Sequence, residues 1–76
     1  ELHLRGMRAE DALLRLERYL DDAYSAGLPF VRIVHGKGTG TLRQLVRQAL
    51  SESPLVSRWE NALDNEGGDG VTIARL

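Results

Sequence analysis

The feature that most constrains the fold is the alternation of short strand-like segments with two segments of helical periodicity. Apolar residues recur every three or four positions between residues 8 and 26, as on one face of an amphipathic helix. A second such segment follows a glycine-rich turn and ends near Ser53 and Pro54. The apolar positions are Ala9, Ala12, Leu13, Leu16, Leu20 and Ala23 in the first segment and Leu42, Leu45, Val46, Ala49 and Leu50 in the second.

Capping signals support both predicted helices. Glu10 and Asp11 stand in the first turn of the first helix, where carboxylates favour the positive end of the helix dipole. Gly27 is a natural C-terminal stop for that helix. Thr39 or Thr41 is the expected N-cap of the second helix.

The remaining segments predict strands that pack against these helices. Residues 64–70 read DNEGGDG and predict a mobile loop before the last strand. Two successive strand–helix–strand crossovers imply parallel strands, with both helices on the same face of the sheet. We therefore expect an α/β two-layer sandwich of order βαβαββ, with a mostly parallel four-stranded sheet and one open sheet face. The predicted strands are residues 2–6, 30–34, 55–62 and 71–76.

Length and composition limit the function classes. A chain of 76 residues makes a single domain, 1–76, and the start at Glu1 suggests a C-terminal piece of a larger protein. The sequence has no cysteine, which excludes disulfides and thiolate chemistry and fits a reducing cytoplasm. No apolar run approaches the roughly 20 residues that cross a bilayer, so no membrane partner is expected.

Charge is distributed unevenly although the formal net charge is only −1. Residues 23–50 contain Arg32, Lys37, Arg43 and Arg47 and no acidic residue. This all-positive window surrounds the turn HGKGTG at residues 35–40. A local positive field attracts anions even when the whole molecule is close to neutral.

The glycine-rich turn predicts a phosphate site. It joins the end of a predicted buried strand to the start of a helix, where backbone N–H groups are unpaired and glycines admit close approach. A Walker-type loop and a dinucleotide fingerprint both require glycine spacings that the turn lacks. The expected phosphate-binding residues are Gly36, Gly38, Thr39, Gly40 and Arg43, with Lys37 as a mobile positive charge.

The two histidines are candidates for chemistry. His35 ends its strand beside the backbone donors, where it is either a general acid or base or a structural partner of the turn. His3 and Arg5 share one face of the first strand, and Arg5 is expected close to His35 if the first two strands are neighbours. No metal site is predicted, because no acidic cluster accompanies the histidines. Glu66 and Asp69 are the only acids expected near enough to swing in, although solvated loop charges are the better interpretation.

Trp59 is the one remaining residue with a candidate role. Its alternation with Ser57 and Asn61 places it either on the open sheet face, where it would stack on a base, or in a packing position.

The motifs LHLRG, ERYLDDA, HGKGTGTLR and GDGVTIARL, in this order, make the chain resemble the small MutS-related (Smr) domain. The resemblance covers nearly the whole chain and is closest to the version at the C-terminus of bacterial MutS-type proteins. His35, Gly36 and Gly38 match the family's His-Gly-x-Gly block, and Arg5 matches its first motif. His3 replaces the aspartate that is usual in that motif, which puts any aspartate-dependent role in doubt.

The resemblance implies an endonuclease domain that nicks structured or branched DNA, or RNA in some members, and suppresses homologous recombination. His35 would activate water or protonate the leaving oxygen, and Arg5 and Lys37 would stabilise charge on the phosphate; His3 is a weaker candidate. An ATPase and a dimerising region would precede the domain in the parent chain. A divalent ion such as Mg²⁺ or Mn²⁺ stays open as a cofactor.

Two alternatives to the nuclease interpretation stand. The domain is a non-catalytic DNA- or RNA-binding module that recruits the parent ATPase to DNA or the ribosome, or a protein-interaction domain that uses the open sheet face.

Overall fold

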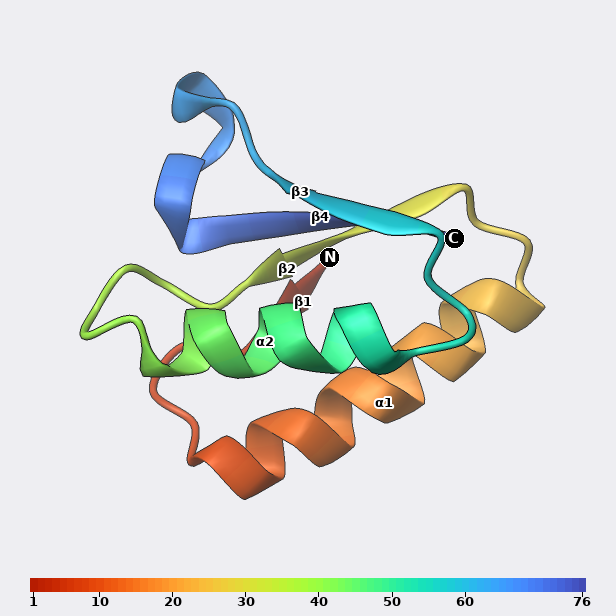
Figure 1. Cartoon of the computed structure of the whole chain (residues 1–76), viewed down its shortest axis with the longest axis horizontal. Coiled ribbons are helices and arrows are strands. Elements are labelled where there is room, and N and C mark those ends of the chain that lie inside the picture. Colours follow the sequence, from red (N-terminus) through yellow and green to blue (C-terminus); the bar gives the residue numbers. More distant parts are fainter.

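A computed structural model describes all residues 1–76 and shows two helices packed on one face of a four-stranded sheet (Figure 1). The two-layer α/β architecture and the order of the elements are those predicted from the sequence. No helix is long and apolar enough to cross a membrane. The elements are β1 (Leu2–His3), α1 (Ala9–Ser25), β2 (Phe30–Val34), α2 (Thr41–Glu52), β3 (Arg58–Asn61) and β4 (Val71–Arg75), with short 3₁₀ turns η1 (Asp64–Glu66) and η2 (Gly68–Gly70) before β4.

The sheet is mixed, so the prediction of a mostly parallel sheet was wrong. Its strand order is β1-β2-β4-β3. Only β1 and β2 pair in parallel, whereas β4 is antiparallel to both β2 and β3. The crossovers do leave β1, β2 and β3 running in the same direction, as expected. However, β4 lies between β2 and β3 and converts two of the three pairings to antiparallel.

The side chains of the last two strands explain this arrangement. The residues of β4 from Val71 to Ala74 are all buried, which suits a strand in the centre of the sheet. β3 reads RWEN and exposes the charged residues Arg58 and Glu60. Such a strand is better placed at an edge, where charges also discourage pairing with another chain. Burial of the more apolar strand therefore decides the pairing.

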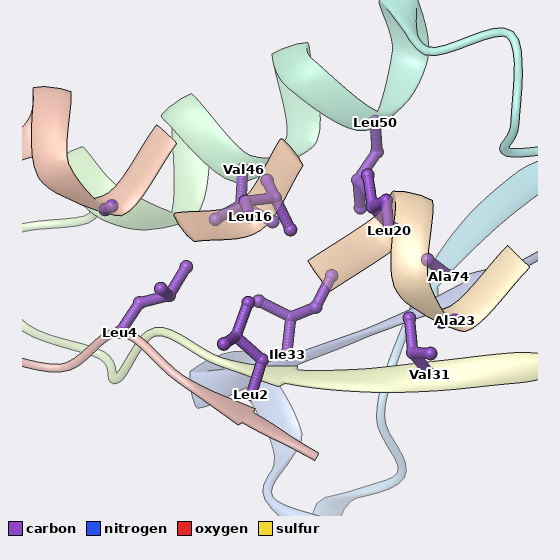
Figure 2. Close-up of a cluster of buried hydrophobic side chains, with 11 residues drawn as sticks. Leu2, Leu4, Leu16, Leu20, Ala23, Val31, Ile33, Val46, Leu50 and Ala74 are labelled. Atoms are coloured by element: carbon purple, nitrogen blue, oxygen red, sulfur yellow. The ribbon is translucent and has the colours of Figure 1, made fainter. Parts of the chain in front are cut away.

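The main core lies between the helices and the sheet (Figure 2). Leu2, Val31 and Ile33 point from the strands toward the helices, and Leu16 and Leu20 of α1 meet them. Each such side chain contributes about 1.5–3 kcal/mol when it leaves water completely. The buried members are Leu2, Leu4, Ala12, Leu16, Leu20, Ala23, Val31, Ile33, Val46, Leu50 and Ala74.

Trp59 packs under α2 and does not lie on the open sheet face. Its neighbour across the sheet is Ala74, a core residue, and its indole N–H donates to the Ser51 hydroxyl at 2.9 Å. The Arg47 guanidinium lies 5.1 Å from the centre of the ring. The packing interpretation of Trp59 is therefore confirmed, and its placement on the open sheet face was wrong.

The helix ends follow the sequence signals in one case and not in the other. α1 starts with Glu10 and Asp11 in its first turn and is followed by Gly27, whose φ is 75°. The predicted threonine cap of α2 was wrong, because the N-cap is Gly40 in a left-handed conformation with φ 86°. A β-branched residue rarely adopts that conformation, and the hydroxyls of Thr39 and Thr41 hydrogen-bond to each other at 2.9 Å.

Candidate functional site

The glycine-rich turn lies where β2 ends and α2 begins, at the edge of both layers (Figure 1). The turn encloses a small pocket of about 170 Å³. The lining is polar except for one leucine and comes almost entirely from one stretch of chain: Gly6, His35, Gly36, Lys37, Gly38, Thr39, Gly40, Thr41, Leu42 and Arg43. The residues predicted to bind phosphate are therefore gathered around one hollow.

Backbone donors of the turn are left free. The N–H groups of residues 37–39 and 41–43 have no acceptor within the protein. No side chain caps α2, so the partial positive charge at its N-terminus is also uncompensated. Free N–H groups and a helix N-terminus together favour an anion in this position.

Three cationic side chains lie on the turn or beside it. Arg5 lies across Gly36, where a β-carbon would be 3.2 Å from the Arg5 Cγ. Arg43 covers Gly40 in the same way, with its Nη2 3.1 Å from the position of a β-carbon. Lys37 runs beside Gly70, with 3.5 Å between its Cγ and a β-carbon there. None of the three forms an ion pair with an acidic side chain.

The other two cations of the acid-free window are already engaged. Arg32 pairs with the Glu1 carboxylate at 3.0 Å and donates to the Glu66 carbonyl at 3.0 Å. Arg47 donates to the Asn61 side chain and contacts Trp59. The structure thus leaves Lys37 and Arg43 available and adds Arg5 from the first loop.

His35 is buried, with 4% of its surface exposed. Its Nδ1 lies 2.9 Å from the Gly36 carbonyl oxygen, which can only accept, so Nδ1 carries the proton. The Nε2 of the neutral ring then accepts from the Thr72 hydroxyl at 2.8 Å. Both ring nitrogens are therefore occupied by the protein in this conformation.

The surroundings of His35 favour its neutral form. Burial lowers the pKa of His35 below its ordinary value of 6.5, and the nearby charges of Arg47 and Arg43 lower this pKa further. The hydrogen bond to Gly36 acts in the opposite direction and is outweighed. A neutral, fully bonded imidazole fits a structural partner of the turn, the alternative left open by the sequence.

His3 does not join the turn. It lies on the sheet face opposite the helices, is largely exposed, and bonds to the Glu1 carboxylate at 2.9 Å. The pKa of this carboxyl lies below its ordinary value of 4.5. The larger cause is its hydrogen bond from Arg32, and the smaller is its hydrogen bond with His3. His3 lines neither hollow beside the turn.

The acids of the loop before β4 also stay away from the turn. Neither Glu66 nor Asp69 lines a hollow there. No group of three or more His, Asp or Glu side chains comes together that could hold a metal ion. The structure therefore offers no ready-made set of three protein ligands for a divalent ion.

Larger hollows lie elsewhere on the surface, and two of them bear on the charge near the turn. One of about 400 Å³ adjoins the turn on the open sheet face and is lined by Arg5, Lys37 and Val71 among others. The other, of about 460 Å³, lies between the helices and carries Glu17 and Asp21 on its rim. The first extends the positive surface, whereas the acidic rim of the second repels phosphate.

Sequence reasoning missed two residues that hold the turn in place. The Gly70 carbonyl accepts from the N–H groups of His35 at 3.1 Å and Gly36 at 3.0 Å. Thr72 is completely buried and bonds to His35. A hydroxyl within the apolar run of the last strand was the available signal for Thr72, because a buried hydroxyl requires a partner.

The fold and site define a small α/β domain with a positively charged, glycine-rich strand-to-helix turn. The model of the Smr domain family matches residues 2–76, and the chain belongs to this family. The resemblance seen in the sequence motifs is thereby confirmed.

Named relatives and solved structures agree with this assignment. The protein named Endonuclease MutS2 from Thermomicrobium roseum is 60% identical over 76 residues, and its counterpart from Geobacillus thermodenitrificans is 57% identical. Each match covers 100% of this chain and 10% of the relative, so the chain spans about a tenth of their length.

The crystal structure of the Smr domain of Thermus thermophilus MutS2 superposes with a TM-score of 0.97 at 43% identity. The match covers 99% of this chain and 94% of that one. YdaL, a stand-alone small MutS-related protein from Escherichia coli, matches with a TM-score of 0.90 at 28% identity, over 99% of this chain and 62% of its own.

Proposed function

We propose that this domain binds the phosphodiester backbone of DNA at the glycine-rich turn and nicks structured or branched DNA. Within a longer parent chain that contains an ATPase and a dimerising region, this activity would suppress homologous recombination. The name of the relatives, Endonuclease MutS2, supports the assignment to nucleases. The observation that carries the proposal is the coincidence of acceptor-free N–H groups with three cations that have no acidic partner.

In this proposal the turn binds the reacting phosphate. The N–H groups of residues 37–39 and 41–43 donate to its non-bridging oxygens, and Arg43 neutralises its charge. Water attacks phosphorus, the bond from phosphorus to the leaving oxygen breaks, and that oxygen takes up a proton from solvent in place of the one that the attacking water releases. Arg5 and Lys37 stabilise the negative charge that builds up in the transition state. Loss of one such donor lowers a rate by about a hundredfold or more.

His35 contributes to this reaction mainly by shaping the turn. To act as a general base, His35 would have to break the hydrogen bond between its Nε2 and Thr72 and expose Nε2 to water. In this conformation only 4% of the residue is exposed. Direct proton transfer by His35 therefore requires a rearrangement of the turn, and attack by water without an enzymatic base is the simpler proposal.

A non-catalytic role is the second candidate, and the burial of His35 favours it. If no side chain at the turn activates water, the same donors and cations make a docking surface for DNA or RNA. Such a module would recruit the parent ATPase to its nucleic acid without cutting it.

Nicking of supercoiled and branched DNA by the isolated domain tests the proposal, because the Thermus relative crystallised as a chain of similar extent. Each assay is run with added Mg²⁺ or Mn²⁺ and with a chelator, and DNA binding is measured in parallel. We expect wild type to nick and Lys37→Ala and Arg5→Ala to lose about a hundredfold or more in rate.

Arg15→Ala is the matched control, because Arg15 is exposed on α1 and has no acidic partner. Arg43→Ala should mainly weaken binding and lower the slope of affinity against salt by about 1. Tight binding without nicking under every metal condition would replace the nuclease proposal by the docking module. Nicking that all four variants retain would place the active site elsewhere.

A further inference from the structure

A buried hydroxyl in the central strand has a specific partner at the turn. Thr72 has no exposed surface and lies in β4, whose neighbouring residues are apolar. Its hydroxyl hydrogen-bonds to His35 Nε2 at 2.8 Å, across 37 positions of the chain. Because a buried hydroxyl without a partner is unfavourable, this contact fixes the position of the imidazole.

The Gly36 carbonyl, which can only accept, places the ring proton on Nδ1, 2.9 Å away. The Thr72 hydroxyl, which can donate or accept, then donates to the unprotonated Nε2. The opposite tautomer would place a lone pair against the carbonyl oxygen and lose this hydrogen bond. The Gly36 carbonyl thus selects the tautomer of His35, and Thr72 holds the ring in place through the other nitrogen.

The orientation of one peptide plane connects this network to the proposed phosphate site. The Gly36 carbonyl and the Lys37 N–H belong to the same trans peptide and point in opposite directions. When His35 holds the carbonyl inward, the Lys37 N–H points outward and remains without a protein acceptor. Gly36 reaches this conformation with φ 81°, in the region that favours glycine.

We propose that Thr72 is a positioning residue of the turn, acting through His35 and the Gly36 carbonyl to aim the Lys37 N–H at a bound phosphate. This inference rests on the proposed binding of phosphate at the turn. It does not depend on whether the bound nucleic acid is cut.

The test compares Thr72→Val with Thr72→Ser. Valine matches threonine in shape and removes the donor to Nε2, whereas serine keeps the hydroxyl. We expect Thr72→Val to bind a short DNA duplex about tenfold more weakly than wild type, the factor that corresponds to loss of one well-made hydrogen bond. Thr72→Ser should bind within about twofold of wild type by the same reasoning.

Leu20→Val is the control for a general loss of stability, since Leu20 is a core residue of α1 that does not line the turn. Nitrogen-15 NMR of the His35 ring reports directly on the Thr72–His35 hydrogen bond. In wild type and Thr72→Ser, Nδ1 should carry the proton and Nε2 should show the shift of a hydrogen-bonded acceptor nitrogen. In Thr72→Val, Nε2 should show the shift of an acceptor that has lost its donor.

Three results would overturn the inference. They are a wild-type protein with the proton on Nε2, a Thr72→Val variant that binds DNA like Leu20→Val, and a Thr72→Ser variant as weak as Thr72→Val. A wild-type proton on Nε2 would overturn the inference even if Thr72→Val does not fold. Absence of DNA binding by wild type would instead contradict the proposed function, while the tautomer would still report on the network itself.

Discussion

At the scale of single residues, the position of His35 could be predicted from the sequence, but its role could not. Its place at the end of a strand, followed by glycine, was readable from the sequence. Its partners were not, because Thr72 comes from a strand 37 positions away and the Gly36 carbonyl is engaged only once the turn has closed. Histidine is a residue type that often transfers protons, but the fold holds His35 as a neutral hydrogen-bonding partner.

This state of His35 predicts a pH dependence of stability. The pKa of His35 is lowered in the folded protein, mainly by burial, whereas the unfolded chain titrates near 6.5. Below that pH the unfolded state binds a proton that the folded state does not, so the free energy of unfolding falls. Neutral His35 therefore contributes its full stabilisation above pH 6.5. This stabilisation is lost as the pH falls from 6.5 toward the pKa of the folded state, at no more than about 1.4 kcal/mol per pH unit.

Denaturant unfolding of wild type and His35→Gln at several pH values between about 7 and 5 measures this contribution. The variant should show a shallower dependence than wild type. His3→Gln removes the only other histidine, so its slope separates the contribution of His35 from that of His3. The lowered pKa of the Glu1 carboxyl acts only below 4.5 and stays outside the window. Equal slopes for wild type and His35→Gln would contradict the assignment.

At the scale of elements, the glycines of the turn have different reasons for being glycine. Gly36 and Gly38 both have positive φ, of 81° and 36°. A β-carbon at Gly36 would meet Arg5 at 3.2 Å, whereas one at Gly38 would meet nothing within 4 Å. Both positions require the backbone freedom of glycine, but only Gly36 also requires its lack of a side chain.

Substitution of Gly36 and of Gly38 by alanine should lower stability equally but affect DNA binding differently. Gly36→Ala and Gly38→Ala should each cost about 1–2 kcal/mol of unfolding free energy, the strain of a left-handed alanine. Gly36→Ala should in addition displace Arg5 and weaken DNA binding more than Gly38→Ala does. Denaturant midpoints and DNA titrations of the two variants measure both effects. A Gly38→Ala variant with the weaker DNA binding would refute the placement of Arg5.

The order of the strands in the sheet could not be predicted as well as the elements themselves. Helical and strand periodicity are local properties, so the number, order and direction of the elements could be predicted. The order of the strands within the sheet could not be predicted. A β3–β4 hairpin can pair with β2 through either of its two strands, and periodicity does not say which. The relative burial of VTIAR and RWEN decides it, and comparing the two segments for charge would have favoured β4 as the central strand.

At the scale of the whole molecule, charge is segregated along the helix layer. The positive turn lies at the N-terminus of α2, and the acidic rim of the hollow between the helices includes Glu52 at the other end of α2. α2 has no basic residue in its last turn, so its dipole reinforces this polarity. Anions are therefore attracted to one end of the domain although the net charge is −1.

The small size of the domain makes its core sensitive to truncation. A chain of this length is expected to have a total stability of about 4–11 kcal/mol. Leu16→Ala, at a completely packed position, should remove about 2–5 kcal/mol of it. Leu14→Ala changes a residue two positions away that is 67% exposed and should change stability by less than about 0.5 kcal/mol.

Thermal and denaturant unfolding of these two leucine variants provide the measurement. Equal losses in the two would mean that α1 does not present Leu16 to the sheet. A large loss confined to Leu16→Ala would support the core shown in Figure 2.

The sequence by itself determined the segments of helix and strand, the apolar faces, the glycine turn and its acid-free surroundings, because these depend on neighbours within a few positions. Only the tertiary structure decided that β4 lies in the centre of the sheet, that Trp59 packs under α2 and that Arg32 and Arg47 are engaged. It also brought Thr72 and Gly70 to His35. These outcomes depend on competition for burial and for hydrogen-bond partners among residues far apart in the chain, and that competition is resolved only when the whole core forms.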